Sequence, residues 1–91
     1  MSHLAARKQP LINRIRRIAG QVAAVERALE EEADCAVTLQ RLAAVRGAVD
    51  GLLQEIIAEH LQEHVAHPGL SDAERAEGAE ELIAVIRRYA P

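Results

Sequence analysis

Three side chains of this sequence have the chemistry and the spacing of metal ligands. Cys35 offers a thiol, and His60 and His64 offer two imidazoles four positions apart. On a helix this spacing places both imidazoles on one face, from which they can bind a single ion. Neutral imidazoles suit zinc, copper, cobalt and nickel. Each residue also has a plainer interpretation, because a lone cysteine at a helix start is most often a small apolar residue and surface histidines reach this spacing by chance.

The candidate ligands lie on one long helical pattern, which runs from Cys35 to His64. Its apolar residues recur at threes and fours, and Pro68 supplies a stop beyond it. Cys35 and His60 are 25 positions apart, which corresponds to roughly 37 Å at about 1.5 Å of rise per residue. The two residues therefore cannot share an ion within one chain.

A second copy of this helix, placed antiparallel, would bring Cys35 beside the partner's His60. The centre of this pairing lies between Gly47 and Ala48, in a stretch of small residues that lets two backbones approach closely. We therefore predict an antiparallel, twofold symmetric dimer with two Cys/His sites. The length of the helix favours the same assembly, because two shorter neighbours could not cover its apolar stripe.

The composition predicts an all-α fold and a single domain over residues 1–91. Phe and Trp are absent and there is one Tyr, so the core must be aliphatic, which suits helix packing better than a sheet. Pro10 fits the first turn of a helix, and Ser71 and Glu74 have the spacing of a capping box. The predicted elements are a mobile N-terminal arm over residues 1–9 and three helices over about residues 10–31, 35–66 and 72–89.

The charge is distributed unevenly along the chain. The net charge is −3, but no acidic residue precedes Glu26, so the first 25 residues carry +5 and the remainder carries −8. These five basic residues could simply form an ordinary solvated helix face. An oligomer, however, would repeat them symmetrically and could neutralise several phosphates at once. There is no recognisable helix-turn-helix and no aromatic platform, so binding would depend on phosphate contacts and DNA shape. The candidate DNA-binding residues are Lys8, Arg14, Arg16, Arg17 and, less directly, Arg46.

Several classes of protein are disfavoured. There is no run of 18 apolar residues, and no positively charged leader is followed by a hydrophobic segment. We therefore expect no membrane span and no secretory signal, and we expect the protein to be cytoplasmic. A single cysteine cannot form an internal disulfide, and it would remain a thiol in a reducing compartment. The sequence offers no plausible triad of nucleophile, base and orienting group, and it has no cofactor-binding loop. We therefore do not expect the protein to be an enzyme.

These residues together resemble a known family of small, all-helical bacterial repressors, which includes the copper sensor CsoR, the nickel/cobalt sensor RcnR and the formaldehyde sensor FrmR. The most specific segments are RIRRIAGQV at 14–22, LQRLAAVRGAVDGL at 39–52 and HLQEH at 60–64. The resemblance implies three-helix subunits that form antiparallel dimers and then tetramers. It also implies operator binding without a standard DNA-reading motif.

The ligand positions indicate the sub-group. In the nickel/cobalt sensors the ion is bound at positions that match His3, Cys35, His60 and His64, all present here. Copper sensors have cysteine in place of His64, and persulfide sensors need two cysteines. The resemblance therefore implies a repressor of a metal-efflux gene that binds DNA in the apo form and is released by Ni(II) or Co(II), although Zn(II) or copper could also bind in vitro. Whether His67 or a terminal amine completes the coordination stays open.

Two alternatives remain. Formaldehyde sensors use the helix-2 cysteine, here Cys35, and the N-terminal amine, and RIRRIAGQVAAVERALE resembles them as much as it resembles the nickel sensors. However, they typically begin with proline where Ser2 stands here, and they usually have an acidic residue in place of His64. The alternative of another class is a helical metal-binding oligomer that does not bind DNA.

Overall fold

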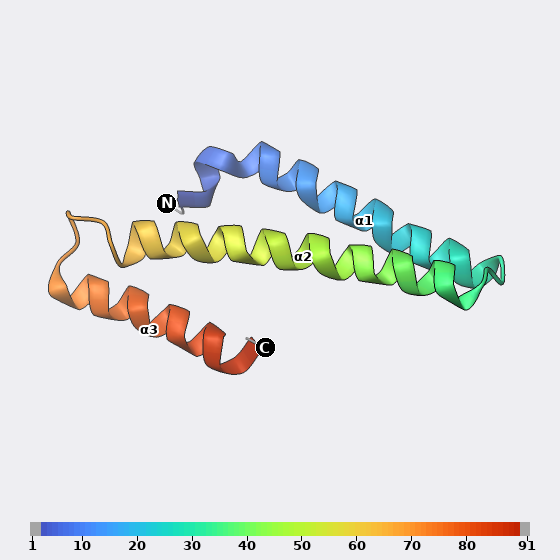
Figure 1. Ribbon diagram of the computed structural model, residues 1–91. Helices are drawn as coiled ribbons and strands as arrows, with labels where there is room; N and C mark the ends of the chain where they lie inside the picture. The colour runs from blue at the N-terminus through green and yellow to red at the C-terminus, as the bar shows by residue number, and fades with distance from the viewer. Residues whose placement is uncertain (1–2, 90–91) are drawn as a thin grey trace. The chain divides into compact units, whose positions relative to one another are not determined.

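The computed structural model describes residues 3–89, and of His3 only the backbone. The predicted all-α class with a long central helix is confirmed: the described residues form a short 3₁₀ helix and three α-helices (Figure 1). No helix among them is long and apolar enough to cross a membrane. The chain divides into two compact units, residues 1–53 and 54–91.

The N-terminal segment differs from the predicted mobile arm. A 3₁₀ helix, η1, spans His3–Arg7 and leads directly into α1, which spans Lys8–Glu30. Ala5 and Ala6 are strong helix formers, and Leu4 is half-buried, which explains why the chain is already helical here. Pro10 is the third residue of α1, within the first turn, where its missing N–H leaves no intrahelical hydrogen bond unmade.

A tight turn joins α1 to α2, which spans Cys35–His64. The N–H of Glu32 donates to the carbonyl of Leu29 (3.2 Å) and that of Ala33 to the carbonyl of Ala28 (2.9 Å), the bonding pattern of a Schellman motif. Glu32 has φ 53°, a left-handed conformation that glycine would adopt at lower cost. The backbone carbonyl of Asp34 then accepts the first hydrogen bonds of α2, from Val37 and Thr38.

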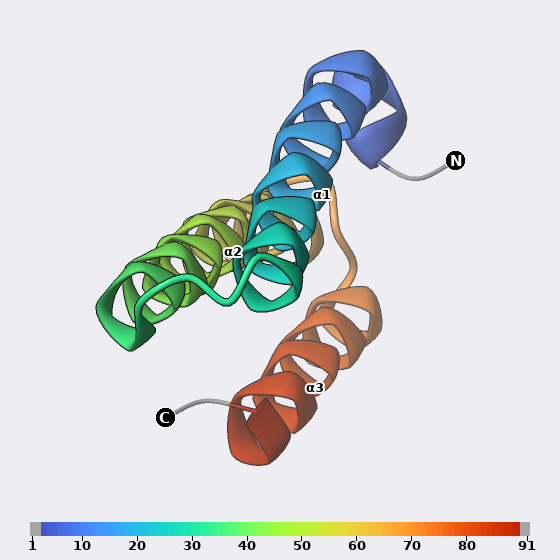
Figure 2. The ribbon, with the colours of Figure 1, turned by 90° about the vertical axis from the view of Figure 1, so that its right-hand side faces the viewer.

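In the unit formed by residues 1–53, α1 lies against the first part of α2, next to the turn, in both views (Figures 1 and 2). Arg41 of α2 donates to the carbonyl of Ala24 in α1 at 3.1 Å. The apolar stripe of α1 splits into two rows with a seven-residue spacing. The first row is half-buried and consists of Leu11, Ile18 and Val25. The second row, here called the outer row, is at least half exposed and consists of Ile15, Val22 and Leu29.

In the unit formed by residues 54–91, the end of α2 is followed by a loop and by α3, which spans Asp72–Tyr89. After His64, the N–H groups of Val65 and Ala66 still donate to the carbonyl oxygen of Leu61. The predicted helix ended at residue 66, two residues later than α2, and these two residues continue its hydrogen bonding in part. The helix limits lie within two residues of those predicted. The capping box is confirmed: the Ser71 N–H donates to Glu74 Oε1 at 2.9 Å and the Glu74 N–H to Ser71 Oγ at 3.1 Å.

Gly78 allows α3 to pack directly on the end of α2. It is buried, and a Cβ atom built on it would lie 2.0 Å from the carbonyl oxygen of His64 and 2.7 Å from its carbonyl carbon. Since both atoms belong to the backbone, no side-chain movement could make room. The contact therefore requires glycine.

We predict that Gly78→Ala lowers the free energy of unfolding by about 1–3 kcal/mol, because the helices must separate to admit a methyl group. Gly20→Ala is the matched control: a Cβ there would have no atom within 4 Å, and alanine should stabilise α1 by about 0.5–1 kcal/mol. Urea unfolding at one protomer concentration measures both. Equal midpoints for wild type and Gly78→Ala would contradict the packing described.

The capping box also gives a prediction about pH. The hydrogen bond from the Ser71 backbone, followed by that from its side chain, holds the pKa of Glu74 below its ordinary value. A lowered pKa means that ionised Glu74 stabilises the helix start above the ordinary carboxyl range and that this contribution is lost as the pH falls through the lowered pKa. An NMR titration of the Glu74 carboxyl should show the pKa rising in Ser71→Ala and staying low in Ser71→Thr. An unchanged value in Ser71→Ala would refute the assignment.

Candidate metal and DNA sites

The imidazoles of His60 and His64 lie together on the last turns of α2. Their ring centroids are 4.8 Å apart, with the ring planes tilted by 41°, and both residues are half-buried. The sequence-based prediction that they share one helix face is therefore confirmed. Two imidazoles so arranged can approach one ion from the same side.

The orientation of His60 is fixed by α3. Its Nε2 lies 2.9 Å from the carbonyl oxygen of Gly78, and Glu81 Oε2 lies 3.8 Å from the same nitrogen. A carbonyl can only accept a hydrogen bond, so Nε2 carries the proton and donates. In the neutral ring, Nδ1 then holds the lone pair that a metal needs, and a histidine ligand is typically held by such a bond on its other nitrogen.

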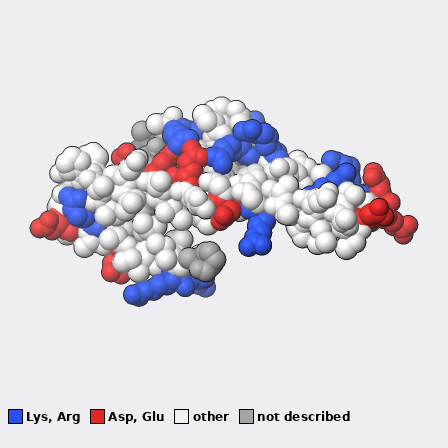
Figure 3. Space-filling model, in the orientation of Figure 1, with Lys and Arg blue, Asp and Glu red and all other residues white. Residues whose placement is uncertain are grey.

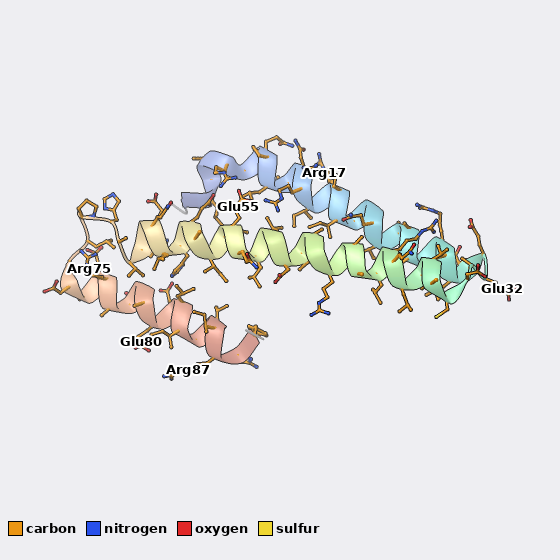
Figure 4. The ribbon with its side chains drawn as sticks, viewed as in Figure 1. Arg17, Glu32, Glu55, Arg75, Glu80 and Arg87 are labelled. Atoms are coloured by element: carbon orange, nitrogen blue, oxygen red, sulfur yellow. The ribbon has the colours of Figure 1, made fainter. Side chains whose placement is uncertain are left out.

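Gly78 and Arg75, which hold this arrangement, were missed in the sequence analysis. The Arg75 guanidinium donates to the carbonyl oxygens of Val65, His67 and Leu70, and so holds the loop between α2 and α3 (Figure 4). A glycine in the middle of a helix costs roughly 1 kcal/mol against alanine, and that cost was the available signal for Gly78. Arg75 gave no comparable signal, because arginine is an ordinary helix residue.

The other histidines of the sequence have different positions. His67 is exposed in the loop, and its Nδ1 accepts a hydrogen bond from the N–H of Gly69 at 3.0 Å. The side chain of His3 lies outside the described residues, as does the N-terminal amine. The structure therefore tests neither as a ligand.

Cys35 is the first residue of α2 and is exposed. It belongs to the unit of residues 1–53, whereas His60 and His64 belong to the other. Among the described residues, no three His, Cys, Asp or Glu side chains are grouped so as to hold a metal ion. The chain thus supplies a cysteine and a histidine pair, and a complete site requires further donors.

Four of the five predicted DNA-binding residues lie in the first half of α1, and the fifth, Arg46, lies in α2. Arg14 and Arg17 line a cavity of about 340 Å³ between α1 and α2. Lys8 and Arg16 are exposed on α1, and Arg46 lines a separate apolar hollow on α2. On the face shown in Figure 3, Lys and Arg atoms gather over the first half of α1. Arg14 and Arg17 therefore share one cavity, and Lys8 and Arg16 are exposed on the same helix.

Comparison with known proteins agrees with these features. Residues 7–88 match the family model described as metal-sensitive transcriptional repressor. The chain is 44% identical to a transcriptional repressor RcnR of Salmonella arizonae and 43% identical to one of Escherichia coli K12, in each case over 89 residues and 98% of both chains.

A solved structure is also similar. It is a glutamate-to-histidine variant of the formaldehyde-responsive regulator FrmR from Salmonella enterica serovar Typhimurium, with a TM-score of 0.86 and 40% identity. The match covers 97% of this chain and 99% of that one. These proteins are transcriptional repressors and regulators, not enzymes. This chain therefore belongs to the CsoR/RcnR/FrmR family of metal-sensitive transcriptional repressors.

Proposed function

We propose that this chain represses a metal-efflux gene by binding operator DNA in the apo form, and that it releases the DNA when Ni(II) or Co(II) binds. The observation that carries this proposal is the histidine pair at the end of α2. His60 donates from Nε2 to the carbonyl of Gly78, which leaves its Nδ1 for an ion, and the ring of His64 lies 4.8 Å away. The identity of more than 40% with repressors named RcnR supports it.

The proposed site joins two subunits. His60 and His64 of one subunit would share an ion with Cys35 of the partner, and His3 would complete the coordination. One thiolate and several imidazoles form a donor set of intermediate softness, which suits Ni(II) and Co(II) and also binds Zn(II) or copper in vitro. Because η1, which begins at His3, leads directly into α1, engagement of His3 would move the start of the basic helix.

The apolar surface left exposed supports the antiparallel dimer and a tetramer built from it. In the unit of residues 1–53 the outer row of α1 is exposed, and so are several apolar residues of α2: Leu39, Leu42, Val49 and Leu53. Gly47 is exposed, and a Cβ built on it would meet no atom within 4 Å, so space for close approach lies outside the chain. A second copy of α2 crossing at Gly47 would cover this surface.

DNA binding and metal binding would then oppose each other. If the metal-bound state holds Arg14 and Arg17 in an arrangement that fits DNA poorly, DNA must weaken metal binding by the same factor. Such coupling typically changes an affinity by about 5- to 150-fold. A repressor of this kind acts on DNA in the cytoplasm.

A formaldehyde-responsive repressor is the second candidate. Cys35 is exposed at the first residue of α2, where its thiol is accessible to a small electrophile, and the similar solved structure is a variant of a formaldehyde-responsive regulator. In this alternative Cys35 and the N-terminal amine would react with the aldehyde. His64 would then have no role in sensing.

The effector is tested by fluorescence anisotropy of a labelled duplex that the reduced apo protein has selected from random sequences. We expect Ni(II) or Co(II) to weaken DNA binding by at least about fivefold. His64→Ala should abolish this response, because one imidazole of the pair is lost. The control is His67→Ala, which should retain the metal response, because the Nδ1 of His67 already accepts a hydrogen bond from the Gly69 N–H. Release by formaldehyde alone, lost in Cys35→Ala and retained in His64→Ala, would establish the aldehyde alternative instead.

The DNA surface is tested by the double substitution Arg14→Ala/Arg17→Ala. Removing two phosphate contacts from each subunit that touches the DNA should weaken binding and reduce the slope of log K against log salt concentration by roughly 2 for each such subunit. Arg87→Ala/Arg88→Ala, with the same change of charge in α3, serves as the control and should leave the slope near the wild-type value. If the Arg14/Arg17 variant bound with the wild-type affinity and slope, the proposed DNA surface would be wrong.

A further inference from the structure

The cavity between α1 and α2, here called the α1–α2 cavity, has the lining of an anion site. It is formed by Arg14, Arg17, Ile18 and Gln21 of α1 and by Ala48 of α2. Its volume of about 340 Å³ is far above the roughly 10–15 Å³ that one water molecule needs on the same measure, so it has room for a phosphate group and its waters. All five residues belong to the unit of residues 1–53.

The three polar residues of α1 that line the cavity lie on one face of that helix. Arg14, Arg17 and Gln21 follow one another at steps of three and four, so their side chains lie on one helix face, whereas Arg16, two positions from Arg14, does not. A Cβ built on Gly51 would lie 3.6 Å from Arg14 Nη2, which places the Arg14 guanidinium against the backbone of α2. A guanidinium has five N–H donors, so Arg14 can bind a phosphate oxygen in addition to its other contacts.

Gln21 is the neutral member of this lining. It is half-buried and lines the cavity together with the two arginines. Its amide carries two donors and no charge, so it can bind an oxyanion without repelling the two guanidinium groups. Ile18 and Ala48 supply the apolar part of the lining, and the cavity stays open to solvent beside the exposed Arg17.

We propose that the α1–α2 cavity binds one backbone phosphate of the operator, and that the Gln21 amide donates a hydrogen bond to this phosphate between Arg14 and Arg17. The inference rests on the DNA binding proposed above and assigns to it a defined phosphate position and a further residue. A phosphate in this cavity would be bound by donors of α1 and would lie against Ala48 of α2. A change in the packing of α1 on α2 would therefore alter DNA affinity directly.

The experiment is a coupling cycle between Gln21 and single DNA phosphates. The selected duplex is prepared with one neutral methylphosphonate at a time, and its affinity is measured for wild type, Gln21→Glu and Gln21→Met. Gln21→Glu should weaken binding to the unmodified duplex by about tenfold, through repulsion of the phosphate, and Gln21→Met by less, through loss of the hydrogen bond. Gln40→Glu, an exposed residue of α2, makes the same change of charge outside the cavity and should have a smaller effect.

The decisive result is where the penalty disappears. If the cavity holds one phosphate, the Gln21→Glu penalty should vanish at one symmetry-related set of methylphosphonate positions and persist at all others. A penalty that is the same at every position, or equal to that of Gln40→Glu, would overturn the proposal. Free inorganic phosphate that shifts the Gln21 amide resonances without any position-specific rescue would overturn it as well, because the cavity would then be a small-anion site.

These outcomes are separable from failure of the proposed DNA surface. That failure is seen in Arg14→Ala/Arg17→Ala, whatever Gln21 does. Circular dichroism and the elution volume of each variant, compared with wild type, show whether fold and assembly are intact. A Gln21→Glu variant that keeps both, and still binds Ni(II) as wild type does, tests the phosphate contact alone.

Discussion

The chain buries very little of its own apolar surface, and this constraint shapes most of what it does. Among the residues whose side chains are described, Ala28 and Leu52 are the only buried hydrophobic ones. Leu29, Leu39 and Tyr89 are each at least 60% exposed. At about 25 cal/mol per Å² of apolar surface removed from water, covering such rows is a strong driving force for association. The proposed dimer would cover these rows, and the proposed metal site would lie at the same interface.

The proposed metal site shows how packing can determine coordination chemistry. The missing Cβ of Gly78 permits the α3 backbone to reach α2, and the carbonyl thus brought close selects the nitrogen of His60 that carries the proton. The same contact places an acidic residue, Glu81, beside the ring, so the environment of the ligand is set by α3 although the ligand lies on α2.

Local patterns in the sequence predicted much of this fold. The number of helices, the long α2, the capping box at Ser71 and the shared face of His60 and His64 all depend on residues within one or two turns of each other. What was missed depends on contacts that periodicity does not encode. The 3₁₀ helix at His3–Arg7 replaced a predicted arm, and the left-handed Glu32 formed a turn without the usual glycine. The pairing of Cys35 with His60 stays a prediction, because it requires a second chain.

The hydrogen bonds of Arg75 tie the loop between α2 and α3 to the start of α3. Surface loops usually tolerate changes of length better than the helices they join. Here the guanidinium donates to three carbonyls between Val65 and Leu70, and three residues after Arg75 the chain reaches Gly78. An insertion or deletion in this loop would shift which residue of α3 meets the end of α2, and a residue with a Cβ would then occupy that position. Loop length is therefore coupled to helix register, and a change of length in the loop would have the same steric consequence as replacing the glycine.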